Sequence, residues 1–190
     1  WMLVHHVIGC GRDAYLAATR AAPGFLGAWL NLAAAELALA QPRECERIVR
    51  MILQQTAHAE ALLLLAQALA AQGRLEEAAV ACSEGERVAP HDARFPYQLG
   101  MIADEQKRPG TAAAAHARAL ALDPSLDAAL AQLVFLKRQL CDWTGLDALS
   151  DRLRHAVANG AAEVTPFGFL AEPASADEQL HCARNFAEGT

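Results

Sequence analysis

Small and large apolar residues recur along this sequence at a spacing of 34 residues. Segment 93–126 has Leu99, Gly100 and Ala112 at its positions 7, 8 and 20. Segment 59–92 has apolar or small residues at the same three offsets: Leu65, Ala66 and Ala78. Both segments carry proline at position 32: Pro90 and Pro124. Each segment therefore predicts two helices that pack where one side chain is small, with proline ending the second helix.

This pattern is typical of a tetratricopeptide repeat (TPR), in which helix pairs stack on their neighbours. We therefore expect an all-α fold, a right-handed TPR superhelix of antiparallel helix pairs with extra helices at its C-terminal end. The expected units are a partial repeat over 1–25, repeats over 26–58, 59–92 and 93–126, the first helix of a degenerate repeat over 127–140, and linker helices over 141–190. Gly73 and Pro109-Gly110 are expected to mark turns within two repeats. A generic alanine-rich bundle explains the repeated offsets less well.

The first helix of each repeat is expected to line a concave groove. Position 6 of these helices carries Asn31, Gln98 and Gln132, with Leu64 as the exception, and Gln67 stands at position 9 of its helix. Amide side chains both donate and accept hydrogen bonds, so they can pair with the main chain of an extended peptide. We therefore expect a peptide-binding groove at Asn31, Gln67, Gln98 and Gln132. Ordinary solvated polar positions explain the same pattern equally well.

Composition narrows the remaining function classes. The net charge of −6, without a basic stripe, argues against nucleic acid. The longest apolar stretch, 61–71, is too short to span a bilayer. Five single cysteines without a metal-ligand spacing predict free thiols in a reducing cytoplasm and no metal site. His116 stands at position 24, where a packed helix residue is expected.

After Cys141 the repeat signature is lost. Apolar residues at helical spacing predict a helix from Leu146 to Val157 that ends at Asn159-Gly160. An irregular apolar loop is expected over 164–170. Ser175 and Glu178 have the spacing of a capping box that opens a last helix.

The order of motifs in this segment resembles the family 41 glycosyltransferases, the O-GlcNAc transferases and their bacterial and plant SPINDLY-like relatives, in the bacterial type. The residues that carry the resemblance form three groups: Cys141, Asp142 and Trp143; Thr165, Pro166, Phe167 and Leu170; and Gln179, Leu180, Ala183 and Arg184. Together with the repeats, the resemblance covers nearly the whole chain.

The resemblance implies an enzyme that transfers N-acetylglucosamine from UDP-GlcNAc to Ser or Thr of acceptor proteins. It implies that this segment holds no catalytic residue and needs no metal or cofactor, and that the catalytic lobes follow Thr190. Acceptor proteins would lie along the concave face, with Pro166 and Phe167 near the active cleft. Phe167 and Gly168 replace a histidine pair of the animal members, which favours a shaping role for this loop. The alternative is a non-catalytic TPR scaffold for protein–protein interaction, and in neither case is a nucleic acid or a membrane an expected partner.

Overall fold

The computed structural model describes residues 2–189, with side chains described from residue 11 onward. In this range all regular structure is helical, and no strand occurs. The helices are α1 (Met2–Ala21), α2 (Leu26–Ala38), α3 (Pro42–Leu53), α4 (Ala59–Ala70), α5 (Leu75–Val88), α6 (Arg94–Glu105), α7 (Pro109–Leu122), α8 (Asp127–Gln139), α9 (Leu146–Ala158), α10 (Pro166–Phe169) and α11 (Ala176–Gly189). The all-α class predicted from the sequence is confirmed.

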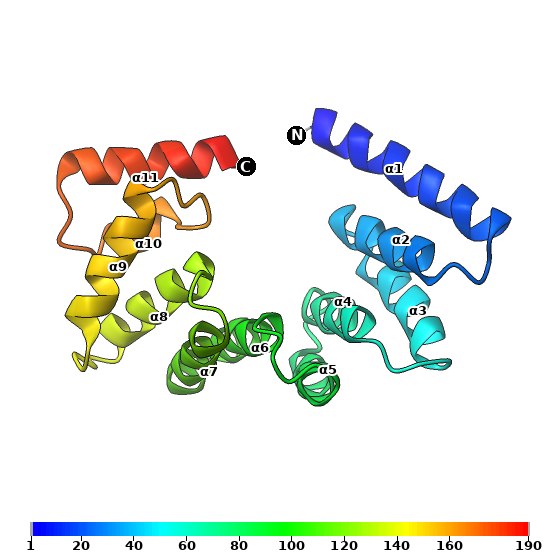
Figure 1. The fold of residues 1–190 in the computed structure, drawn as a ribbon, viewed down its shortest axis with the longest axis horizontal. Coiled ribbons are helices and arrows are strands. Elements are labelled where there is room, and N and C mark those ends of the chain that lie inside the picture. Colours follow the sequence, from blue (N-terminus) through cyan, green and yellow to red (C-terminus); the bar gives the residue numbers. More distant parts are fainter. Residues whose placement is uncertain (1, 190) are drawn as a thin grey trace. The chain divides into compact units, whose positions relative to one another are not determined.

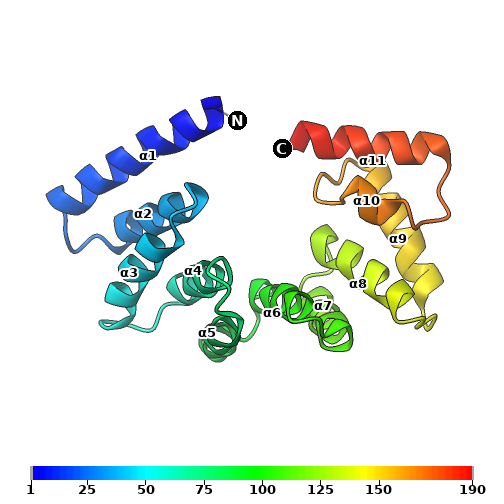
Figure 2. The ribbon, with the colours of Figure 1, turned by 180° about the vertical axis from the view of Figure 1, so that it is seen from behind.

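The chain forms two compact units that divide within α6, the first ending at Gln98 and the second beginning at Leu99. In the first unit α1 packs on α2, α2 on α3, α3 on α4 and α4 on α5. In the second unit α7 packs on α8 and α8 packs on α9. The short helix α10 lies against α8 and α11, and α11 also packs on α9 (Figures 1 and 2). Consecutive antiparallel pairs are the arrangement that the sequence repeat predicts.

Helix pairs approach closely at the small residues that the repeat places at positions 8 and 20. Ala66 and Ala78 are fully buried in the first unit, and Ala112 is fully buried in the second. Ala103 and Leu136 pack with Ala112 in the core of the second unit. A larger side chain at such a position would overlap its neighbour in an interior packed at crystal density.

The turn between the two helices of a repeat has the same backbone geometry four times. One residue in each turn has a positive φ: Ala40 at 57°, Gly73 at 73°, Lys107 at 60° and Cys141 at 53°. All four stand at position 15 of segments beginning at 26, 59, 93 and 127. The amide of the following residue donates to a carbonyl five residues earlier in each turn: Gln41 to Glu36, Arg74 to Leu69, Arg108 to Ala103 and Asp142 to Lys137. This is the Schellman ending of a helix, in which a left-handed residue satisfies the last carbonyls.

The structure of these turns differs from the sequence-based prediction at two places. Pro109 does not lie in the turn, as the sequence suggested, but opens α7, because proline at the first helical position loses no needed donor. Lys107 is the left-handed residue instead. At Cys141 the backbone keeps the repeat turn although the sequence signature has ended, and α9 follows α8 as a second helix follows a first.

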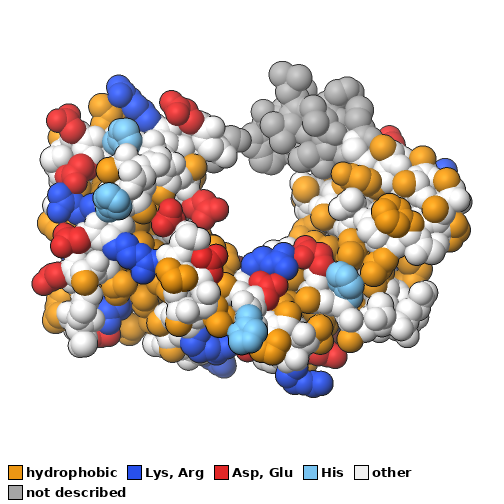
Figure 3. Space-filling model, in the orientation of Figure 1, with side chains coloured by type: hydrophobic (Ala, Val, Ile, Leu, Met, Phe, Trp, Pro, Cys, Tyr) orange, Lys and Arg blue, Asp and Glu red, His pale blue; other side chains and the backbone are white. Residues whose placement is uncertain are grey.

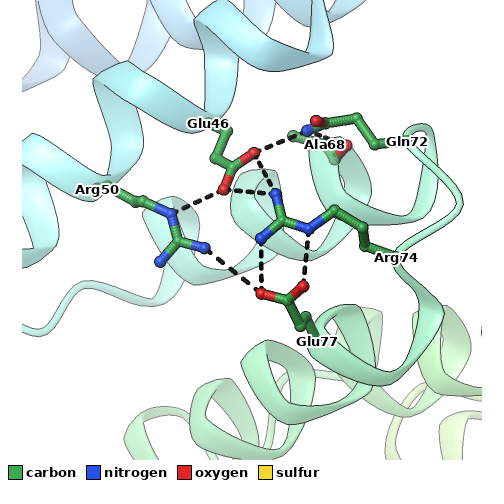
Figure 4. Close-up of polar contacts among 6 residues, drawn as sticks. All are labelled: Glu46, Arg50, Ala68, Gln72, Arg74 and Glu77. Atoms are coloured by element: carbon green, nitrogen blue, oxygen red, sulfur yellow. Dashed lines mark hydrogen bonds and ion pairs between the residues drawn. The ribbon is translucent and has the colours of Figure 1, made fainter.

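A charge network joins α3 to the turn and helix that follow α4 (Figure 4). The carboxylate of Glu46 accepts from Arg50 Nε at 2.8 Å, from Gln72 Nε2 at 2.8 Å and from Arg74 Nη1 at 2.8 and 2.9 Å. Arg74 also donates to Glu77. Burial raises the pKa of Glu46, but the hydrogen bonds from Gln72, Arg50 and Arg74 outweigh it and hold this pKa at about 2. The network therefore fixes neighbouring helices and needs no ligand to explain it.

The structure describes four of the five cysteines and the surroundings of His116. Cys45, Cys82 and Cys182 are buried thiols, Cys141 is exposed, and none of these four forms a disulfide. Cys10 lies outside the described side chains. His116 is fully buried in α7 as a packed helix residue.

Candidate functional site

The second unit contains a pocket of about 260 Å³ between α8, α9 and the segment that leads into α10. Its lining residues are Ala131, Gln132, Phe135, Leu153, Glu163, Val164, Thr165, Phe167 and Gly168. Gln132 was predicted to lie in a peptide groove, and Phe167 was predicted to lie near an active cleft. The two predictions rest on different sequence features, and the structure brings both residues to one pocket.

The local sequence explains how α10 presents Phe167. Thr165 is the N-cap residue, and its Oγ1 accepts a hydrogen bond from the Gly168 amide at 3.3 Å. Pro166 occupies the first helical position and is half-buried, outside the residues that line the pocket. Residues two apart on a helix face nearly opposite sides. Phe169 is accordingly buried in the unit, while Phe167 is 79% exposed.

A buried ion pair holds the segment after α10 against α8. Glu172 is 5% exposed, and its carboxylate accepts from Arg138 Nε at 2.9 Å and from Arg138 Nη2 at 3.0 Å. The hydroxyl of Ser150 on α9 also donates to this carboxylate. Since Arg138, Ser150 and Glu172 come from three elements, their contacts anchor the chain directly after α10, the helix that carries Phe167 and Gly168 of the pocket.

Helix α11 packs on α9 and α10, and its first turn is fixed by side-chain hydrogen bonds. Ser175 and Glu178 form the predicted capping box, with the Ser175 amide donating to Glu178 at 2.7 Å and the Glu178 amide donating to Ser175 Oγ at 3.3 Å. The Ser175 amide, Arg154 and the Ser175 hydroxyl together lower the pKa of Glu178 to about 2, against a smaller effect of burial. Cys182 Sγ lies 3.5 Å from the Val164 carbonyl oxygen, directly behind the pocket wall.

The rim of the pocket is acidic. Glu163 is exposed, and no ion pair involves it in the part of the chain that the structure describes. Asp127, at the start of α8, has its pKa raised first by burial and then by the negative charge of Glu163, while Arg152 opposes the shift. The guanidinium of Arg152 is itself engaged with the Pro124 carbonyl. Glu163, which lines the pocket together with Phe135 and Phe167, and Asp127 therefore repel each other.

The remaining predicted groove residues lie in the first unit. Asn31 is exposed on α2, and Gln67 and Gln98 are half-buried on α4 and α6. Leu64, the exception at position 6, is 6% exposed and belongs to the core. No side-chain hydrogen bond within the described chain engages any of the four amides, including Gln132. Their hydrogen-bonding groups are thus free for a ligand, and of the four only Gln132 is among the residues that line the pocket of the second unit.

Of the residues that line the pocket, the sequence had selected only Gln132 and Phe167 as site residues, and Phe135 and Glu163 are the most important of those that it did not select. Phe135 stands at position 9 of its repeat, on the side expected to face the groove, so its repeat position could have identified it as a groove residue. Glu163 follows the end of α9 in an irregular segment, where neither periodicity nor a motif distinguishes it.

Other kinds of site are not found among the described residues. No group of three or more His, Cys, Asp and Glu side chains lies close enough to hold a metal ion. No described helix has the length and apolar character needed to cross a bilayer. On the face drawn in Figure 3, basic and acidic side chains are intermixed.

Comparison with solved structures shows the fold. A thermophilic TPR protein of Thermus thermophilus superposes with a TM-score of 0.69 at 19% identity, covering 98% of this chain and 94% of that chain. PilF of Pseudomonas aeruginosa superposes with a TM-score of 0.65 at 16% identity, covering 95% of this chain and 91% of that chain. MamA superposes with a TM-score of 0.61 at 19% identity, covering 77% of this chain and 85% of that chain. The TPR fold is thereby confirmed.

Comparison at the level of sequence adds no family. No model of a known protein family matches this chain, and no curated protein matches it.

Proposed function

We propose that this chain is the acceptor-binding region of a protein O-GlcNAc transferase-like enzyme, and that its second unit forms one wall of the cleft in which the acceptor is glycosylated. The observation that carries the proposal is the shared pocket of Gln132 and Phe167. Gln132 belongs to the repeat, and Phe167 belongs to the segment that resembles the glycosyltransferases. Because both residues line one pocket, a bound protein segment could contact the repeat and the segment at α10 at the same time.

Exposed apolar side chains support the same proposal. Trp143 is 64% exposed, Leu170 is 64% exposed and Leu180 is 49% exposed. All three belong to the motifs on which the resemblance rests. Large apolar residues left at a surface are typical of contact with another domain or chain. Catalytic lobes would supply such a contact.

The residues of this chain would bind and position the acceptor and would not perform the transfer step. Phe167 and Phe135 offer apolar contact, and the amide of Gln132 can pair with a peptide main chain. Glu163 would repel the diphosphate of a sugar nucleotide. The pocket therefore suits the acceptor better than the donor UDP-GlcNAc.

The proposal is tested with the intact protein that contains this sequence. Radiolabelled UDP-GlcNAc is incubated with the intact protein and a mixture of protein acceptors, with and without EDTA. The expected result is label on serine or threonine hydroxyls that survives EDTA. Acceptor binding without any transfer would contradict the glycosyltransferase and support the non-catalytic scaffold, which has the same fold.

A further inference from the structure

We propose that the pocket of the second unit binds one basic side chain, arginine or lysine, of an extended protein segment. The inference rests on the proposed protein-binding function of the chain, but not on glycosyl transfer. It assigns the pocket a ligand of defined charge and shape.

The size of the pocket limits its occupant. Pockets for drug-sized molecules usually measure about 300–1,000 Å³. A pocket of about 260 Å³ lies below that range and suits a single long side chain.

The chemistry of the walls selects the kind of side chain. Phe135 and Phe167 provide aromatic surface, and Leu153 and Val164 provide aliphatic surface. Arginine and lysine combine an aliphatic stem that packs on such surface with a charged head that remains near water. A cation beside a phenyl ring gains further attraction from the ring quadrupole.

The rim selects the charge. Glu163 carries a negative charge without an ion pair in the described chain, and Asp127 lies within its electrostatic influence. The basic group that acts on Asp127 is Arg152, whose guanidinium is engaged with the Pro124 carbonyl. A basic side chain entering the pocket would relieve the repulsion between the two carboxylates, whereas an acidic one would add to it.

The experiment measures peptide binding to this chain by NMR. The probes are five extended peptides of the form Gly-Ser-Ala-Val-X-Val-Ala-Ser-Gly, in which X is Arg, Lys, Leu, Gln or Glu. We expect the Arg and Lys peptides to shift the resonances of Ala131, Val164 and Gly168 and to bind at least about fivefold more tightly than the Leu, Gln and Glu peptides. Tighter binding of the Leu peptide, or equal binding of the Glu peptide, would overturn the proposal.

Variants locate the effect. Glu163→Gln should weaken binding of the Arg peptide by roughly threefold to fivefold, and Phe167→Ala by a similar factor. Asp151→Asn, which removes an exposed carboxylate of α9 outside the pocket, should leave binding unchanged. Equal effects of Glu163→Gln and Asp151→Asn would indicate general attraction to an acidic protein and would contradict a defined site.

The failure of this inference can be told apart from the failure of the proposed function. Glycosyl transfer by the intact protein with no preference for basic peptides would overturn the inference and leave the transferase in place. A preference for basic peptides that depends on Glu163, without transfer by the intact protein, would support the pocket and contradict the transferase.

Discussion

The imidazole of His116 fills the space that Gly100 leaves by having no side chain. A Cβ atom built on Gly100 would lie 2.5 Å from Cε1 of His116. Both residues are buried, so neither ring nor helix can shift without disturbing the core. The small residue at position 8 and the ring at position 24 of this repeat are therefore matched in volume.

Gly100→Ala should destabilise the protein by roughly 1–3 kcal/mol, because the added methyl group overlaps the His116 ring. Urea unfolding gives the free energy. The matched control is Gly110→Ala, since a Cβ on Gly110 meets no atom within 4 Å. A Gly100→Ala variant as stable as the Gly110→Ala variant would contradict the packing described here.

The burial of His116 should make stability depend on pH. Burial lowers the pKa of His116 to about 4, against a smaller opposite effect of Asp104. The unfolded chain then binds this proton more readily than the folded chain does. Stability should fall as pH drops from 6.5 towards 4 and should be fully regained above 6.5.

Unfolding at several pH values tests this with His116→Leu, in which the pH dependence between 6.5 and 4 should shrink. His155→Gln, at an exposed position of α9, is the control. A His116→Leu variant that retains the full dependence would exclude His116 as its source.

Substitutions at the left-handed residue of two repeat turns should change the stability of the protein in opposite directions. Lys107 carries a side chain at a φ of 60°, whereas Gly73 occupies the equivalent turn at 73°. Lys107→Gly should stabilise the protein by up to about 1 kcal/mol, and Gly73→Ala should destabilise it by about 1 kcal/mol. Changes of the same sign in thermal unfolding of the two variants would show that the two turns are not equivalent.

The Arg138–Glu172 pair should hold the pocket wall in place. Glu172→Ala leaves the Arg138 guanidinium without its buried partner, which should lower the free energy of unfolding by roughly 3 kcal/mol. Cleavage by a protease should then increase between residues 160 and 175 before the repeats are attacked. Glu188→Gln, at an exposed site on α11, serves as the control, and an unchanged cleavage pattern for Glu172→Ala would refute the positioning role.

The repeat helices were predictable because their period, small residues and prolines repeat in the sequence. The turn residues were less predictable from the sequence. Gly73 follows the rule that a positive φ favours glycine, but Lys107 and Cys141 also have a positive φ and are not glycine. There the packing of two helices overrides the local preference. The sequence also misplaced Pro109, since proline suits a turn and a helix start equally.

The candidate site was predictable only in part. Gln132 and Phe167 were identified, the first from its repeat position and the second from the resemblance. That these two residues line one pocket could not be foreseen, because it depends on the path of the segment between α9 and α10 and on the Arg138–Glu172 pair, which anchors the chain directly after α10. Glu163 stands in that irregular segment, so only the fold shows that it lies at the rim.

The most direct test of the account is the acceptor dependence of glycosyl transfer by the intact protein carrying Phe167→Ala. The account predicts transfer of GlcNAc with a KM for the protein acceptor raised by roughly fivefold, an unchanged KM for UDP-GlcNAc, and no effect of Phe25→Ala, which alters an exposed phenylalanine of the first unit. The absence of transfer by the intact protein, or an acceptor KM that Phe167→Ala leaves unchanged, would contradict it.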